Sequence, residues 1–410
     1  MNFLRRHPLA VILTLLVIAG AFAPLPPIVD AVTGAPAGDA EVTRPVAYVL
    51  AAPVSNVLDA VTFLSMGRAI WFLVCWIVVL AGLGAMLPGT RGRRIFRGVL
   101  GILSPCGVAV AAVLLPRPVP RLTTAELPES GLTIVDYHSH TERSHDGRHG
   151  WTLERLGEWH ADQGYQAAYV TDHNAPYVGS NDDAPIPLLP GVEWSVYRQH
   201  VVALGTVKQI DLTPYSQDTP GMIGLFGALH AQGALAIVSL PEYWLNHWDD
   251  LEQFVAGGVD GFEIVNCAPK ALAFPDTARR AVITLARRHE LLVTGASDNH
   301  GWGKVTCVWN LTHEGVHGFD GNHVLARPIA LMQGDLPSWS AAYSQLWLMF
   351  RGLSWAERMS WLTWIALIWI YRGIPRRKGQ TAGLGILART LGRSDRSAMG
   401  SPATPGTRRA

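Results

Sequence analysis

The chain has 410 residues, is 49% hydrophobic and carries a formal net charge of +1. A near-neutral chain gives no electrostatic case for a nucleic-acid partner, and its four cysteines are too few for a disulfide scaffold. The mean hydropathy of +0.18 is high for a wholly soluble protein. Apolar residues concentrate before residue 116 and again near 345–371. Composition therefore predicts a membrane region beside a soluble one.

Three apolar segments in residues 1–116 predict transmembrane helices, at 8–28, 69–87 and 99–115. The first also fits a signal peptide, but the spans that follow favour an uncleaved anchor. Arginines precede the first segment and recur in the predicted loop 90–97. Such residues mark the cytoplasmic side of a membrane. We therefore predict an integral protein of the cytoplasmic membrane, with the residues after 115 on the extracytoplasmic side.

The rest of the chain divides by composition. Residues 117–130 are a proline-rich linker, 131–315 a soluble domain and 379–410 a disordered tail. Residues 340–375 hold a further membrane or interfacial helix. Its uncharged stretch 359–371 is short for a full span, but the basic residues that follow favour a return to the cytoplasm.

Strand-like and helix-like segments alternate in the soluble domain, which predicts an α/β fold with parallel strands. The predicted strands are 132–135, 167–170, 201–204, 234–240, 262–265 and 291–294. The predicted helices are 152–163, 220–232 and 275–290.

Five short motifs stand at or just after apolar runs. They are Asp136-Tyr137-His138-Ser139-His140, Asp146-Gly147, Thr171-Asp172-His173, Gly191-Val192-Glu193 with His200, and Ser297-Asp298-Asn299-His300. The carboxyl ends of parallel barrel strands meet at one mouth, and imidazoles with carboxylates are ligands for Zn, Mn or Fe. The motifs therefore predict one metal site. Two members have ordinary alternatives, because Asp146 fits a turn and His200 fits a strand end.

In this order, the five motifs resemble the PHP (polymerase and histidinol phosphatase) domain family over residues 131–311. The resemblance implies a distorted (β/α)7 barrel, two to three divalent metal ions and hydrolysis of phosphoesters. It also implies a ligand set. The first metal would take His138, His140, Glu193 and Asp298; the second would share Glu193 and take His200; the third would take Asp146, His173 and His300. The family's usual His-Pro pair is replaced here by Leu240-Pro241, which removes one ligand of the second metal.

Three further residues are predicted to be catalytic. Asp172 adjoins a ligand and is expected to orient an imidazole. Arg148 and Arg198 are expected to clamp a phosphate, with a solvated arginine as the alternative for each.

The sequence thus predicts a membrane-anchored phosphoesterase that uses metal-activated water on a phosphate mono- or diester. Its substrate would be a small-molecule or lipid-headgroup phosphoester, with no nucleic acid involved. The missing ligand at Leu240 leaves a second hypothesis, a catalytically weak metal-binding module of a membrane complex. Metal-dependent hydrolysis of a non-phosphate bond is a third. A disulfide between Cys267 and Cys307, the metal identity and the oligomeric state stay open.

Overall fold

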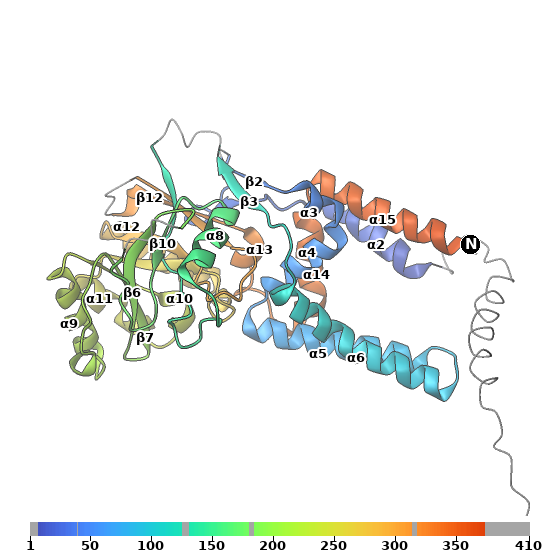
Figure 1. Cartoon of the computed structure of the whole chain (residues 1–410), viewed down its shortest axis with the longest axis horizontal. Helices are drawn as coiled ribbons and strands as arrows, with labels where there is room; N and C mark the ends of the chain where they lie inside the picture. Colours follow the sequence, from blue (N-terminus) through green and yellow to red (C-terminus); the bar gives the residue numbers. More distant parts are fainter. Residues whose placement is uncertain (1–6, 39, 125–130, 180–183, 314–317, 374–410) are drawn as a thin grey trace, which may run out of the picture.

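The computed structural model describes residues 7–38, 40–124, 131–179, 184–313 and 318–373. An α/β body built on one curled sheet occupies one end of the molecule, and four long helices extend from it on one side (Figure 1). These helices are α2 (Pro8–Phe22), α5 (Met66–Met86), α6 (Arg91–Leu114) and α15 (Trp355–Gly373).

Ten strands form the main sheet, in the order β1-β12-β11-β4-β5-β6-β7-β8-β9-β10. Their bounds are β1 Val29–Asp30, β4 Thr133–Asp136, β5 Ala167–Val170, β6 Leu188–Val196, β7 Gln199–Leu204, β8 Leu235–Val238, β9 Gly261–Asn266, β10 Leu292–Ala296, β11 Val308–Thr312 and β12 Asn322–Ala326. The pairs β4–β5, β5–β6, β8–β9 and β9–β10 are parallel. The pairs made by β7, β11 and β12 are antiparallel.

The predicted α/β class is confirmed. The prediction of parallel strands holds for four pairs, but the sheet is mixed because the other pairs are antiparallel. The β6–β7 hairpin reverses the chain, because a two-residue turn at Tyr197 and Arg198 joins the strands. A closed (β/α)7 barrel is not shown either. The sheet curls until the segments that follow β4 and β10 meet, where Asp298 N–H donates to His138 O at 2.9 Å. Backbone ladder pairing between β4 and β10 themselves is absent from the described strands.

The helices of the α/β body have clear local causes. They are α8 (Leu153–Gln163), α9 (Thr219–His230), α10 (Leu240–Tyr243), α11 (Leu251–Ala256) and α12 (Asp276–Arg288). Thr152 caps α8 by accepting from Arg155 N–H, and Gly164 ends it with φ +94°. On α12 the apolar side chains Val282 and Ala286 are buried in the main core. The helices predicted at 152–163, 220–232 and 275–290 are thereby confirmed.

Two helices in the described part of the chain, α5 and α6, are long and apolar enough to cross a membrane. They form a hairpin in which glycines allow close approach. A Cβ at Gly84 would lie 2.7 Å from the Arg97 backbone, and one at Gly101 would lie 2.5 Å from Leu80 backbone. The helix at the predicted first span, 8–28, is shorter than expected, since α2 ends at Phe22. The arginines expected in a loop instead form the first turns of α6.

The last membrane prediction concerns the C-terminal helix. Helix α14 (Ala341–Gly352) precedes α15, whose 19 residues include charged groups at both ends. By composition, α15 is therefore not one of the described helices that could cross a membrane. The predicted tail 379–410 lies outside the described residues.

Segments outside 131–315 also join the α/β body. Strand β1 precedes the α5–α6 hairpin yet pairs with β12, which lies beyond residue 315. Within the predicted linker 117–130, β3 (Arg121–Thr124) pairs with β2 (Ala40–Thr43). A disulfide between Cys267 and Cys307 joins the end of β9 to the start of β11.

Candidate metal centre

The eight predicted ligands come together at one end of the sheet, from segments far apart in sequence. His138 and His140 follow β4, His173 follows β5, and Asp298 and His300 follow β10. Glu193 and His200 come from the β6–β7 hairpin, and Asp146 comes from the loop after His140. Groups of these side chains converge closely enough to hold metal ions.

The innermost group offers four ligand atoms: His138 Nε2, His140 Nε2, Glu193 Oε2 and Asp298 Oδ1. Glu193 Oε2 lies 3.1 Å from His138 Nε2 and 3.3 Å from His140 Nε2, while Asp298 Oδ1 lies 3.7 and 3.2 Å from the same two atoms. A tetrahedral ion with ligand bonds of about 2.0–2.1 Å separates its ligand atoms by about 3.3–3.4 Å. The spacing therefore fits one tetrahedral ion.

Neighbouring groups fix which ring nitrogen of each histidine is protonated. His138 Nδ1 lies 2.6 Å from Glu263 Oε1, a carboxylate that can only accept when ionised. His140 Nδ1 lies 2.9 Å from Ser144 Oγ, whose own hydroxyl donates to Asp172 Oδ1 at 3.0 Å. In a neutral imidazole the proton is then on Nδ1 in both rings. The two Nε2 atoms, 2.9 Å apart, face each other as acceptors.

The carboxylates around this point also lack donors. Glu193 Oε2 and Asp298 Oδ1 are buried and have no hydrogen-bond partner among the described residues. Buried acceptors without partners are costly and call for an explanation. Four convergent lone pairs with no donor between them fit a bound cation, so the residues present match the metal expected here.

Glu193 connects this group to a second one. Its other oxygen, Oε1, lies 2.6 Å from His200 Nδ1. The hairpin explains the approach: Ser195 pairs with His200, and Tyr197 and Arg198 have φ +43° and +62°, the pattern of a type I′ turn. Glu193 and His200 consequently lie on one face, as diagonal cross-strand neighbours.

A third group lies toward solvent. Asp146 Oδ1 is 3.2 Å from His300 Nε2 and 3.7 Å from His173 Nε2, and the two Nε2 atoms are 3.5 Å apart. His300 Nδ1 lies 3.0 Å from the Asp298 carbonyl oxygen, which again leaves Nε2 as the acceptor. The Asp146 side chain is 49% exposed, so this group forms the outer edge of the centre.

The charges of the centre are strongly coupled. Burial alone would lower the pKa of His138, but Glu193, Glu263 and Asp298 raise it well above its ordinary value. Burial likewise opposes ionisation of Glu193, yet His138 and His200 hold its pKa well below the usual range. Against burial, Asp146 and Asp298 raise the pKa of His300 to about 9. Positive charge close by therefore stabilises the buried carboxylates, and either protons or metal ions can supply it.

The three predicted catalytic residues have different surroundings. The Asp172 carboxylate is buried and accepts from Thr141 N–H and Thr141 Oγ1, both at 2.7 Å, and from Ser144. It therefore orients His140 through Ser144 and holds the loop that follows. Arg148 is half-buried and donates its backbone N–H to His300 O at 2.9 Å. Arg198 is exposed in the hairpin turn.

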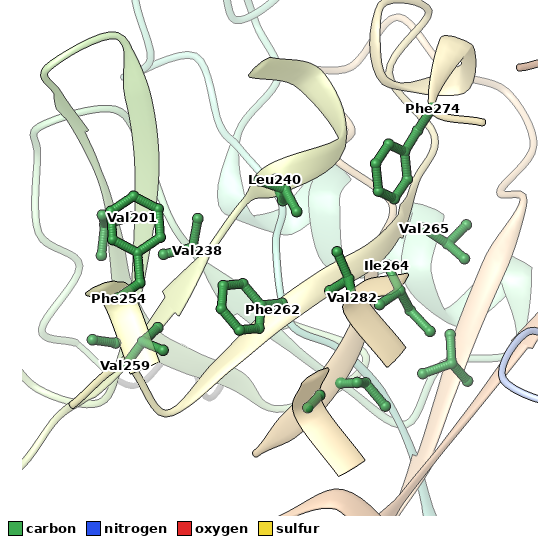
Figure 2. Close-up of a cluster of buried hydrophobic side chains, with 14 of the residues drawn as sticks. Val201, Val238, Leu240, Phe254, Val259, Phe262, Ile264, Val265, Phe274 and Val282 are labelled. Atoms are coloured by element: carbon green, nitrogen blue, oxygen red, sulfur yellow. The ribbon is translucent and has the colours of Figure 1, made fainter. Parts of the chain in front are cut away.

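Leu240, where the resemblance expects a ligand, belongs to the hydrophobic core. Its side chain is 0% exposed and packs in the same cluster as Val238, Phe262 and Phe274 (Figure 2). The neighbouring carboxylate of Glu242 lies nearer the centre, with Oε2 3.7 Å from His200 Nδ1.

A cationic side chain stands beside this second group. Lys270 Nζ lies 3.7 Å from Glu242 Oε1 and 3.3 Å from the centroid of the Tyr243 ring. The Tyr243 ring in turn contacts His200, with centroids 4.8 Å apart. Lys270 is therefore placed to reach an anion at this edge of the centre.

Sequence reasoning missed Glu263, Ser144 and Lys270. Glu263 is 1% exposed and also accepts from Ser239 Oγ at 2.6 Å. A signal existed, since Glu263 is an acid inside the otherwise apolar strand β9. For Ser144 and Lys270 the sequence carries no such signal, because each lies in a loop.

Comparisons with known proteins leave the family open. No protein-family model and no curated protein matches the chain. Among solved structures, the chain is similar to the crystal structure of PsfC from Pseudomonas syringae PB-5123, with a TM-score of 0.37 and 16% identity over 52% of this chain and 98% of that chain.

Proposed function

We propose that the protein is a metal-dependent phosphoesterase of the PHP type, which hydrolyses a phosphate mono- or diester. The observation that carries the proposal is the convergence of His138 Nε2, His140 Nε2, Glu193 Oε2 and Asp298 Oδ1. The two carboxylate oxygens of this set have no hydrogen-bond partner among the described residues. Two further groups, sharing Glu193 or lying beside it, provide for additional ions. The resemblance of the five motifs to that family supports the same chemistry.

When bound, divalent ions supply an activated water and neutralise charge on a phosphate. The protein's own residues do the rest. Glu263 and Ser144 orient the inner imidazoles. Lys270 stands beside Glu242 and Arg148 beside His300, and both supply positive charge for a substrate phosphate. In the innermost group His138 and His140 are 0% exposed, so water reaches the centre only from its outer edge.

We further propose that α5 and α6 anchor the protein in the cytoplasmic membrane, with the α/β body on the extracytoplasmic side. The loop between these helices lies far from the sheet (Figure 1), and the arginines at the start of α6 therefore stand at the distal end. The disulfide Cys267–Cys307 supports an oxidising compartment for the α/β body.

The test is turnover by the full-length protein in detergent, loaded in turn with Zn, Mn or Fe. The panel comprises p-nitrophenyl phosphate, bis-p-nitrophenyl phosphate and glycerophosphodiesters, with released phosphate or alcohol as the readout. A His138→Ala/His140→Ala double variant should lose hydrolysis, while His230→Ala, which alters a half-exposed histidine paired with Asp260, should retain it. Undiminished turnover in the double variant would refute the proposal.

The burial of Leu240 in the core favours a second candidate, a metal-binding module without strong activity. That candidate predicts full metal loading with no turnover of any phosphoester in the panel. Hydrolysis of a non-phosphate bond, the third hypothesis, would be recognised by product analysis of amide and ester substrates under the same conditions.

A further inference from the structure

A cavity lies where the helical part meets the α/β body, apart from the metal centre. It lies between α4 (Ala52–Thr62), α14, the start of α15 and the segment after β12, and has a cavity volume of about 80 Å³. These elements gather at the junction in Figure 1. None of the eight predicted metal ligands lines this cavity. It is therefore a separate site.

Two carboxylates in the wall of the cavity already have cationic partners. Asp59 pairs with Arg117 at 2.9 Å and accepts from Tyr48. Glu357 pairs with Arg44 at 3.2 Å. Each acid is thereby neutralised by its own guanidinium, and neither needs a further partner from the cavity.

Arg327 is the cation left over. It lines the cavity and is 8% exposed, and its Nε donates to Thr306 O at 2.9 Å. Its Nη2 is buried and has no hydrogen-bond partner among the residues that the structure describes. Burying a charged N–H donor without a hydrogen-bond partner costs free energy. In the described part of the chain Arg327 thus has no ion pair of its own, although Asp59 and Glu357 attract its charge from farther away.

The Arg327 guanidinium is also held in place before anything binds. It lies against the ring of Phe63, 5.6 Å from its centroid, and against that of Trp309, 5.3 Å from its centroid. A guanidinium held in this way has a planar shape and N–H donors that suit the oxygens of a phosphate. Because the fork is preorganised, little side-chain entropy is lost when an anion binds.

Part of the cavity wall is apolar. Leu348, Met349 and Leu353 line the cavity, and they stand on or beside α14, which packs against α2. A charged base with an apolar wall that leads onto the projecting helices fits an amphiphile rather than a free ion.

We propose that this cavity binds the phosphate group of an anionic phospholipid, with Arg327 as its counter-ion and the acyl chains along α14. The assignment to a lipid headgroup, and not to free phosphate, rests on the membrane location proposed above. The phosphate site itself does not depend on the metal centre or on phosphoesterase activity.

The experiment uses the full-length protein in a nonionic detergent with EDTA present, so that no metal ion binds the probe. Native mass spectrometry and thermal unfolding are followed with dioleoylphosphatidylglycerol, with dioleoylglycerol as the lipid that lacks phosphate, and with inorganic phosphate alone. We expect the phosphatidylglycerol to bind and to raise the unfolding midpoint, and dioleoylglycerol to do neither. Arg327→Gln should weaken that binding about tenfold or more, since it removes a charge-assisted contact.

A second variant keeps the proposal testable if Arg327→Gln does not fold. Gly352 lines the cavity, and a Cβ there meets no heavy atom within 4 Å, so Gly352→Leu fills space without backbone strain. Its matched control is Gly227→Leu, because Gly227 is also a helical glycine with open space but lies on α9. Gly352→Leu should weaken lipid binding, and Gly227→Leu should leave it unchanged.

Three outcomes are distinguished. Equal binding of phosphatidylglycerol and dioleoylglycerol, or unchanged binding in both cavity variants, overturns the proposal. Binding of inorganic phosphate that is lost in Arg327→Gln, with no gain from the lipid, supports the phosphate site and assigns it to a free phosphate. Failure of the phosphoesterase test leaves this result untouched, because the metal centre is empty in EDTA.

Discussion

The Nε2 atoms of His138 and His140 lie 2.9 Å apart in a buried cluster, with each Nδ1 hydrogen-bonded elsewhere. Two neutral imidazoles so arranged repel, because each offers a lone pair to the other. The carboxylates of Glu193 and Asp298 add further negative charge at the same point. The arrangement is therefore stable only with positive charge in its middle, and the predictions below concern what supplies it.

Asp298→Ala should lower the metal content of the protein by at least one ion per chain. The change removes a carboxylate from the innermost group, and Asp298 holds its side chain there from a left-handed backbone with φ +47°. Elemental analysis of the purified variant and the wild type measures the effect. Asp211→Ala is the matched control, since Asp211 is exposed and bonds only to Thr213. Equal metal content in Asp298→Ala and wild type would contradict the assignment.

Glu263→Ala should weaken metal binding about 10–100-fold, although Glu263 is not itself a predicted ligand. Its carboxylate holds His138 Nδ1 at 2.6 Å and keeps Nε2 turned to the centre. Competition with a chromogenic chelator measures the affinity. Glu263→Gln retains an acceptor oxygen and should recover part of the loss. A drop in thermal stability without any change in affinity would show that Glu263 acts on the fold alone.

Metal binding should strengthen as the pH rises from 6 toward 9. The pKa of His138 and His200 is raised by Glu193, and that of His300 is raised to about 9 by Asp146 and Asp298. A raised pKa means that, without metal, each of these rings holds its proton to a higher pH than a free imidazole does. A metal ion must displace those protons, so acid favours the metal-free state.

Isothermal titration calorimetry at pH 7 in two buffers of different ionisation enthalpy counts the protons released per metal ion. We expect net release in both buffers and a steeper binding curve at higher pH. Binding without proton release would mean that the histidines are already neutral, contrary to the directions of the pKa shifts.

Leu240→His should destabilise the protein and add no metal. The residue is fully buried among apolar side chains (Figure 2), so an imidazole there would lack hydrogen-bond partners. The cost is about 1–3 kcal/mol for an unsatisfied polar group. Thermal unfolding and elemental analysis measure the two effects. A gain of one metal ion would show that the β8–α10 junction can turn this side chain to the centre.

Much of the metal centre can be predicted from the sequence, because its ligands stand in short motifs at strand ends. His138, His173 and His300 each follow a run of apolar residues that forms a strand. Glu263 and Lys270 could not be found in the same way. Their partners, His138 and Tyr243, are 125 and 27 residues away in the chain, and only the fold brings them together.

The fold is less predictable than the centre, for physical reasons. The hairpin turn at Tyr197 and Arg198 lacks the Asn-Gly or Asp-Gly signature that usually marks a type I′ turn. Strand β1 has only two residues, and its pairing with β12 depends on contacts made by the whole body. The arginines at the start of α6 continue a helix, because Thr90 caps it by accepting from Arg93 N–H.

Breaking the disulfide between Cys267 and Cys307 should loosen the metal centre as well as the fold. The bond closes a separation of 40 residues, for which removal costs about 2–5 kcal/mol. Cys267 directly follows Asn266, whose Nδ2 donates to Asp298 Oδ2 at 3.1 Å. We expect the Cys267→Ser/Cys307→Ser variant to unfold at lower temperature and to bind metal more weakly.

The control is Cys106→Ser, because Cys106 is a free cysteine on α6, away from the centre. Tris(2-carboxyethyl)phosphine, a reductant without thiol groups, should weaken metal binding in the wild type and should have no effect on the double variant, which has no bond left to reduce. If the wild type holds its metal equally well under reduction, the end of β9 is positioned by the sheet alone. In that case Asn266 keeps Asp298 in place without help from the disulfide.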